Sequence, residues 1–200
     1  MKKIAFIILF IAVGLTSCKD FLSLSPEYQI NEINYYKTES DYETAMIGIY
    51  NTLQGLYNLT ILYPAELLTD NTNINSYTWD TTTSEFDYAE VTSSNGVVNS
   101  IWTYCFTAVA YSNNILSRID GSGLSQTKIN QYKGEALFIR ALCYFNLVRL
   151  YGKVPIVDVA FRSPNEIFAF DMTRQPVANV YAQIEDDLKQ AATLLDGISL

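Results

Sequence analysis

The sequence predicts an all-α fold, a bundle or α-solenoid of consecutive antiparallel helices with one long irregular loop. Apolar residues recur at spacings of three and four through most of the chain, the period of a helix that buries one face. Residues that cap and end helices flank these stretches. With 49% apolar and 17% charged residues, the chain can also bury a core. No exact repeat period is visible, so both arrangements stay open.

Two helical segments are predicted before residue 70. Ser40 to Glu43 has the form of a capping box, in which the Ser hydroxyl and the Glu carboxylate each accept a backbone N–H. The apolar period behind it predicts a helix over about residues 41–57. A second, shorter helix is expected from Pro64 to Thr69.

The chain from Asp70 to about Asn95 shows no helical period and is rich in Asn, Thr and Ser. Loops of this length are uncommon in compact domains, and they are usually functional or disordered. Four aromatic residues within this polar segment favour a functional loop: Tyr77, Trp79, Phe86 and Tyr88.

Helical periodicity returns over residues 97–119, 126–151 and 176–196. Ser125 is the expected N-cap of the second of these helices, and Gly152 has the place of its left-handed C-cap. The segment between the second and third helices is predicted to be irregular.

The N-terminus has the pattern of a lipoprotein signal peptide. Lys2 and Lys3 precede ten consecutive apolar residues, Ile4 to Val13, a run too short to cross a bilayer as a helix. Leu15-Thr16-Ser17-Cys18 follows and resembles a bacterial lipobox, in which the thiol of Cys18 carries the lipid. The alternative is an ordinary signal peptide with a chance cysteine.

These features predict three parts of the chain. Residues 1–17 are the lipoprotein signal peptide, residues 18–38 are the lipidated N-terminus and an extended tether, and residues 39–200 are the helical domain.

Composition argues against several classes of function. The chain has 13 basic and 21 acidic residues and no histidine. A nucleic-acid partner is not expected, because neutralising phosphates takes clustered Lys and Arg. Without His there is no Ser-His-Asp or Cys-His nucleophile and no His-based metal site. We therefore predict a binding protein with no cofactor and no metal, rather than an enzyme.

Two acidic stretches look functional but are better explained otherwise. Glu185-Asp186-Asp187 is interpreted as a solvated helix face, with Asp186 reaching Lys189 or Gln190, rather than a catalytic carboxylate cluster. The segment Asp70 to Asn75 lacks the glycine and the glutamate that a calcium loop needs at its sixth and twelfth positions.

Four residues within the helices are interpreted as structural. Cys105 and Cys143 lie in apolar helical patterns, so two buried free thiols are favoured over a disulfide. Arg140 is expected to pack between helices and to bind carbonyls or Glu135, rather than contact a ligand. Trp102 lies on an apolar helical stripe and is assigned to the core.

Several stretches occur in the order and with the spacing of one known family. The most specific are Tyr132–Ala136, Phe138–Ala141, Tyr144–Gly152 and Val154-Pro155. Other matches are Cys18–Leu22 with Pro26, Ala45–Tyr50, Trp102 and Tyr104 with Asn114–Leu116, Arg174, and Val180-Tyr181 with Asp187-Leu188. Over essentially its whole length the chain resembles the SusD/RagB family of lipoproteins.

The resemblance implies tetratricopeptide-like helix pairs and a lipoprotein anchored in the outer membrane, facing the cell exterior. It also implies capture of a glycan, without catalysis, for a partner SusC-like TonB-dependent transporter. Family members are more than twice as long, so an N-terminal portion is expected here. The first alternative is a helical scaffold that binds peptides or a protein partner. The second is a carboxylate-based glycosidase, although no suitably placed pair of carboxylates is evident.

Sugar binding needs an aromatic ring for the apolar face of the pyranose and amide or carboxylate groups for its hydroxyls. The irregular loop offers both, and in the family this segment contributes to the ligand face. The candidate ligand-binding residues are Asp70, Asn73, Asn75, Tyr77 and Trp79. For Trp79, packing against the helices beneath is an equally good interpretation. For Phe86 and Tyr88, packing is favoured.

Lipidation of Cys18 can be tested directly. We expect cells that make the protein and are fed radiolabelled palmitate to incorporate the label, because acyl chains form the anchor. A protein that takes up no label, or that is recovered from the cytosol, would contradict the predicted anchoring.

Overall fold

The computed structural model describes residues 35–74 and 81–198. Residues Tyr36–Leu200 form one compact unit, which contains all the helices described below. This unit is all-α, as predicted. Its four long helices are α3 (Glu39–Gly55), α5 (Gly96–Leu116), α6 (Gln126–Tyr151) and α8 (Val177–Leu195). Within the described ranges, β pairing is limited to an isolated bridge between Val154 and Gln175.

Short helical segments connect the long helices. They are the π-helical turns η1 (Leu56–Thr60) and η2 (Tyr63–Leu67), α4 (Thr81–Asp87), the 3-10 turn η3 (Ile119–Gly121) and α7 (Pro164–Ala169). The polar loop before α5 and the segment between α6 and α8 are both predicted to be irregular. The structure corrects this, because the first contains α4 and the second contains α7. Helices of six or seven residues are too short to show a helical period in the sequence.

The ends of two helices test the capping predictions. The predicted box at Ser40 is wrong, because α3 is capped by Thr38 and Asp41. The Asp41 N–H donates to Thr38 Oγ1 at 3.3 Å, and the Thr38 N–H donates to Asp41 Oδ2 at 2.8 Å. Two capping-box patterns overlap in the sequence, one from Thr38 to Asp41 and one from Ser40 to Glu43, and the first of them forms in the structure. The N-cap of α6 is confirmed as Ser125. Gly152 ends the helix with a positive φ of 69°, as expected, but its ψ of −114° differs from that of the predicted left-handed cap.

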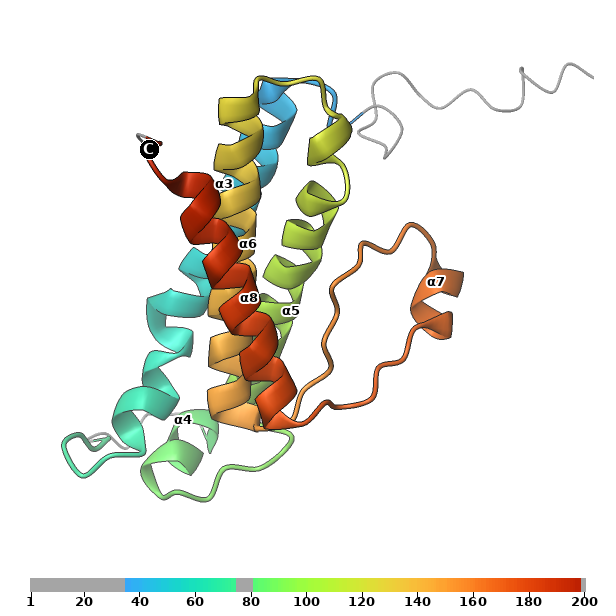
Figure 1. Ribbon diagram of the computed structural model, residues 1–200. Coiled ribbons are helices and arrows are strands. Elements are labelled where there is room, and N and C mark those ends of the chain that lie inside the picture. The colour runs from blue at the N-terminus through green and yellow to red at the C-terminus, as the bar shows by residue number, and fades with distance from the viewer. Residues whose placement is uncertain (1–34, 75–80, 199–200) are drawn as a thin grey trace, which may run out of the picture. The chain divides into compact units, whose positions relative to one another are not determined.

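The long helices pack as two antiparallel pairs, α3 with α5 and α6 with α8, while α5 and α6 also pack together (Figure 1). The first helices of the pairs, α3 and α6, run parallel. At their N-terminal ends Lys128 Nζ lies 3.2 Å from Glu39 Oε1, and near their C-terminal ends Asn146 Nδ2 donates to Tyr57 Oη at 2.7 Å. This is the arrangement of tetratricopeptide-like helix pairs. No helix in the described part of the chain is both long and apolar enough to cross a membrane.

A buried ion pair joins α6 to α8. Arg140 Nη2 and Nε donate to the two carboxylate oxygens of Asp187 at 2.6 and 2.8 Å, and the Asp187 side chain is fully buried. Arg140 is therefore structural, as expected, but its partner is not Glu135. Asp187 also corrects the interpretation of residues 185–187 as a uniformly solvated face. Asp186 fits that interpretation, because it accepts a bond from Gln190 Nε2 at 2.7 Å.

The ion pair extends into a network that reaches the segment after α6. Arg140 Nη1 donates to Asn113 Oδ1 at 2.7 Å, and Asn113 Nδ2 donates to the carbonyls of Val157 and Val159 at 2.9 and 3.1 Å. The Tyr144 hydroxyl accepts the Val157 N–H at 2.6 Å. Burial raises the pKa of Tyr144 to about 12. The network thus ties α5, α6, α8 and one extended segment together.

The two cysteines of the described helices are free and buried, as favoured from the sequence. Cys105 in α5 and Cys143 in α6 belong to one hydrophobic core. A hydrogen bond with Cys105 and burial raise the pKa of the Cys143 thiol. Cys143 is therefore held as a neutral thiol, which is a poor nucleophile.

The buried ion pair predicts a large effect of Asp187→Leu on stability. This change leaves the Arg140 guanidinium buried without its counter-charge, so we expect the free energy of unfolding to fall by about 3–5 kcal/mol. Urea denaturation of the full chain measures it. The control is Glu185→Ala in the same helix, which removes an exposed pair with Lys189 and should cost at most about 0.5 kcal/mol. Equal losses in the two variants would contradict the assignment.

The close approach of α6 and α8 predicts opposite effects of alanine at two glycines. A Cβ at Gly134 would lie 2.6 Å from Leu195 Cγ, whereas one at Gly48 in α3 would meet nothing within 4 Å. We expect Gly134→Ala to destabilise the chain by about 1–3 kcal/mol through overpacking. Gly48→Ala should stabilise it by about 0.5–1 kcal/mol through helix propensity. Thermal unfolding that ranks the variants the other way would refute this packing.

Candidate functional site

The structure describes part of the predicted ligand loop. Asp70 and Asn73 are exposed, and Asn75, Tyr77 and Trp79 lie outside the described residues. Asn73 lines a cavity of about 190 Å³ at the start of the loop, whereas Asp70 is absent from its lining. The described part of the candidate site is therefore this cavity.

The cavity combines the kinds of group that a sugar requires. Its wall is mainly apolar, and the residues that line it also include one each with a phenol, a carboxylate, an amide and a hydroxyl side chain. The lining residues are Leu62, Tyr63, Glu66, Leu67, Thr72, Asn73 and Ile74. Glu66 and Asn73 are both exposed, so their side chains are open to solvent. An aromatic ring can cover a pyranose face while these groups take its hydroxyls.

The cavity is shaped by the turn that follows η2. The backbone carbonyl of Glu66 accepts bonds from Thr69 Oγ1 and Thr72 Oγ1, both at 2.6 Å. These two bonds fold the chain back, so that Asn73 and Tyr63 line the same cavity. Threonine hydroxyls often close turns in this way. The succession of η1 and η2 is also unusual, because π-helical geometry is rare and is often found at functional sites.

Three polar or aromatic residues of the cavity lining are not predicted from the sequence: Tyr63, Glu66 and Thr72. A signal for the first two was present, because they stand three residues apart around Pro64 and just before the polar loop. Residues at this spacing lie on one side of a helical turn. Thr72 lines the cavity only because the chain reverses direction after η2, and no local spacing in the sequence indicates that reversal.

The second half of the loop packs more closely than its composition suggests. Phe86 in α4 is 2% exposed, which confirms its packing role, whereas Tyr88 is 70% exposed and the same prediction for it is wrong. Phe86 also lines a cavity of about 350 Å³ together with Pro64 and Leu68. Tyr88 comes just after Asp87, the last residue of α4, and its side chain remains exposed instead of packing beside Phe86.

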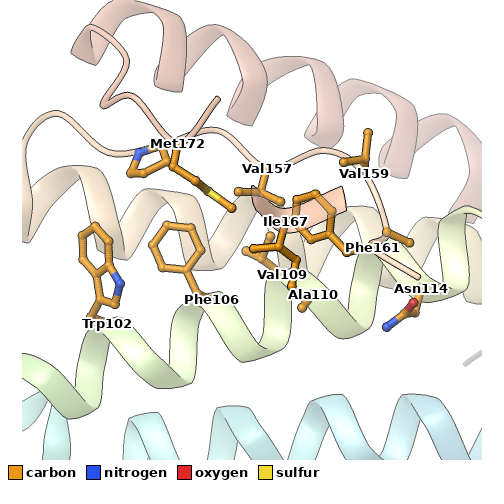
Figure 2. A pocket seen from close by; sticks show the side chains of 12 residues that line it. Trp102, Phe106, Val109, Ala110, Asn114, Val157, Val159, Phe161, Ile167 and Met172 are labelled. Atoms are coloured by element: carbon orange, nitrogen blue, oxygen red, sulfur yellow. The ribbon is translucent and has the colours of Figure 1, made fainter. Parts of the chain in front are cut away.

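A larger cavity, of about 560 Å³, lies between α5 and the segment that joins α6 to α8 (Figure 2). Its lining is apolar apart from the amide of Asn114: Trp102, Phe106, Val109, Ala110, Asn114, Pro155, Val157, Val159, Ala160, Phe161, Ile167 and Met172. With a single polar side chain, this cavity suits an apolar group better than a sugar.

Trp102 packs against the hydrophobic core, as assigned, and it also forms one end of this apolar cavity. Its ring is half-buried and contacts Phe106 and Tyr151, with centroids 4.7 and 5.2 Å away. The Arg174 guanidinium lies 5.4 Å from its centroid. The helical stripe placed Trp102 correctly toward the core side, but it could not predict the depth of burial.

A polar cavity of about 280 Å³ is lined by residues of α3 and α6. Several of the polar side chains that line it are hydrogen-bonded to one another. Tyr50 Oη donates to Glu135 Oε2 at 2.7 Å, and Gln131 Nε2 donates to Glu135 Oε1 at 3.0 Å. Burial and this bond to Glu135 raise the pKa of Tyr50. A ligand here would have to displace existing hydrogen bonds, which makes it a weaker candidate than the cavity of Asn73.

Comparison with known proteins gives a consistent result. The model of a SusD-like family, described as "Starch-binding associating with outer membrane", matches residues 20–199. The SusD-like protein P2 of Formosa agariphila is 27% identical over 191 residues, which are 94% of this chain and 37% of that protein. The SusD-like protein P25 of the same organism is 29% identical over 156 residues, 73% of this chain and 29% of that protein. The chain thus spans about a third of the length of these relatives.

Solved structures show the same fold. A SusD superfamily protein from Bacteroides vulgatus aligns with a TM-score of 0.70 and 23% identity, over 83% of this chain and 36% of that one. A laminarin-binding SusD-like protein aligns with a TM-score of 0.68 and 22% identity, over 80% of this chain and 34% of that one. At these identities the likeness establishes the helical architecture.

Proposed function

This chain belongs to the SusD-like family, and from that premise we propose that it captures glycan outside the cell without catalysis and passes it to a SusC-like TonB-dependent transporter. The observation that carries the proposal is the cavity that Asn73 lines together with Tyr63 and Glu66. It brings an aromatic ring, an amide and a carboxylate together at the start of the predicted ligand loop. Asp70, Asn75, Tyr77 and Trp79 complete the proposed binding residues.

The absence of catalysis is proposed from the chemistry of the cavity. Glycoside hydrolysis generally uses two carboxyl groups that flank the scissile bond at a fixed separation. Of the two carboxylates among the proposed binding residues, Glu66 and Asp70, only Glu66 lines the cavity of Asn73. A single carboxylate can accept hydrogen bonds from sugar hydroxyls, which is sufficient for capture.

The proposed cellular arrangement follows from the N-terminal sequence and the family. The family is described as associating with the outer membrane. We propose that residues 1–17 are removed as a signal peptide, that Cys18 carries the lipid, and that residues 18–38 tether the helical domain at the cell exterior. Cys18 itself lies outside the described residues. A tethered binding protein raises the local concentration of glycan near its transporter.

A second candidate function is the binding of an apolar peptide or a protein partner. The observation that favours it is the 560 Å³ cavity in Figure 2, whose lining has one polar side chain, that of Asn114. Aromatic and aliphatic side chains of a peptide would fill such a cavity better than a sugar would.

Calorimetric titration of the full chain with oligosaccharides of starch and laminarin, and with apolar peptides, tests the proposal. We expect saturable sugar binding. Asn73→Ala should weaken it by roughly two- to tenfold, because one hydrogen bond contributes about 0.5–1.5 kcal/mol. Trp79→Ala should weaken it through loss of stacking. Asn71→Ala is the matched control, because Asn71 is exposed and is not among the residues lining the cavity.

Three outcomes would contradict parts of this proposal. Saturable peptide binding without sugar binding would favour the second candidate function. Unaltered glycan affinity in Trp79→Ala would reject that residue as a ligand contact. Equal affinities of Asn73→Ala and Asn71→Ala would reject the cavity as the site.

A further inference from the structure

Glu85 in α4 holds three neighbouring groups with one oxygen atom. Its Oε2 accepts the Thr92 N–H and the Thr92 hydroxyl, both at 2.9 Å, and the Asn95 side-chain amide at 3.0 Å. These hydrogen bonds lower the pKa of Glu85, which therefore keeps its charge at neutral pH. Bonds to a charged acceptor are stronger than those between neutral groups.

Asn95 connects this carboxylate to the start of α5. The residue is buried and is the N-cap of α5, with its Oδ1 accepting the Val97 N–H at 2.9 Å. Its Nδ2 also donates to the Thr82 carbonyl in α4 at 2.8 Å. Glu85 and Asn95 therefore fix the position of α4 on the N-terminal end of a long core helix.

Helix α4 also contacts the turn η2, whose residues line the candidate cavity. Phe86 of α4 is 2% exposed and lines the 350 Å³ cavity with Pro64 of η2 and with Leu68 just after η2. The same turn η2 presents Tyr63 and Glu66 to the cavity of Asn73. Contacts between neighbouring elements thus run from α5 through α4 to η2, which forms part of the wall of the candidate site.

We propose that Glu85 is a positioning residue for glycan binding, acting through α4 and Phe86 on the side chains of η2. The inference rests on the proposed function, because it concerns the affinity of that site. Glu85 does not line the cavity of Asn73, so it acts without touching the ligand. Its loss allows α4 to shift on α5, and the wall formed by Tyr63 and Glu66 then no longer keeps one geometry. A site that must order itself on binding has lower affinity.

The test compares Glu85→Ala and Glu85→Gln with the control Glu90→Ala in the full chain. Glu90 is exposed in the same loop, and its replacement removes the same charge. The probe is maltoheptaose or a laminarin oligosaccharide, whichever the unmodified chain binds. We expect Glu85→Ala to raise the Kd about tenfold at 25 °C. Glu85→Gln should recover part of the affinity, since its amide oxygen can still accept from Thr92.

Melting temperatures of all variants separate positioning from stability. A purely structural role of Glu85 would lower the melting temperature while leaving the Kd at 25 °C unchanged, and this result would overturn the inference. Equal Kd values for Glu85→Ala and Glu90→Ala would overturn it as well, with the proposed function intact. If the unmodified chain binds neither probe nor any other sugar, the proposed function fails and the inference fails with it.

Discussion

The helical unit depends on a charge that is stable only because it is paired. The Asp187 carboxylate is fully buried in α8, and removing an ion from water costs several kcal/mol unless its partner is close and well aligned. Arg140 supplies two parallel bonds from α6, which is the geometry that a guanidinium offers to a carboxylate. This ion pair joins α6 to α8 in the same interface as the close apolar approach of Leu195 to Gly134.

The same guanidinium links the helix pairs to the apolar cavity. Its third bond orients Asn113, whose amide then holds the carbonyls of Val157 and Val159. Those two residues form part of the wall of the cavity in Figure 2. The buried Val157 carbonyl also accepts the Tyr144 hydroxyl at 3.1 Å, so two side chains pair this carbonyl, which lies outside a helix or a sheet. The buried ion pair and the shape of that cavity are thus parts of a single network.

The candidate glycan site is built by different means at another place on the unit. Its wall comes from a π-helical turn, from threonine hydroxyls that close a reversal, and from α4 held by Glu85. None of these groups belongs to the core of the long helices. This separation of the candidate site from the core is physically sensible, because a rigid scaffold can support a polar loop whose residues serve a ligand rather than the fold.

The sequence by itself determined the long helices, the free cysteines, the N-cap of α6 and the family, because period, capping residues and motif spacing are local properties. It also singled out Asn73 within the polar loop. Only the tertiary structure decided that Asp187 is buried while its neighbour Asp186 is exposed, that Trp102 borders a cavity, and that Tyr63 and Glu66 share a cavity with Asn73. The physical reason is that such contacts join residues on different elements, for example Arg140 and Asp187, which are 47 positions apart. Local periodicity specifies which face of a helix is buried, and the packing of the elements determines the partner that each buried polar group finds there.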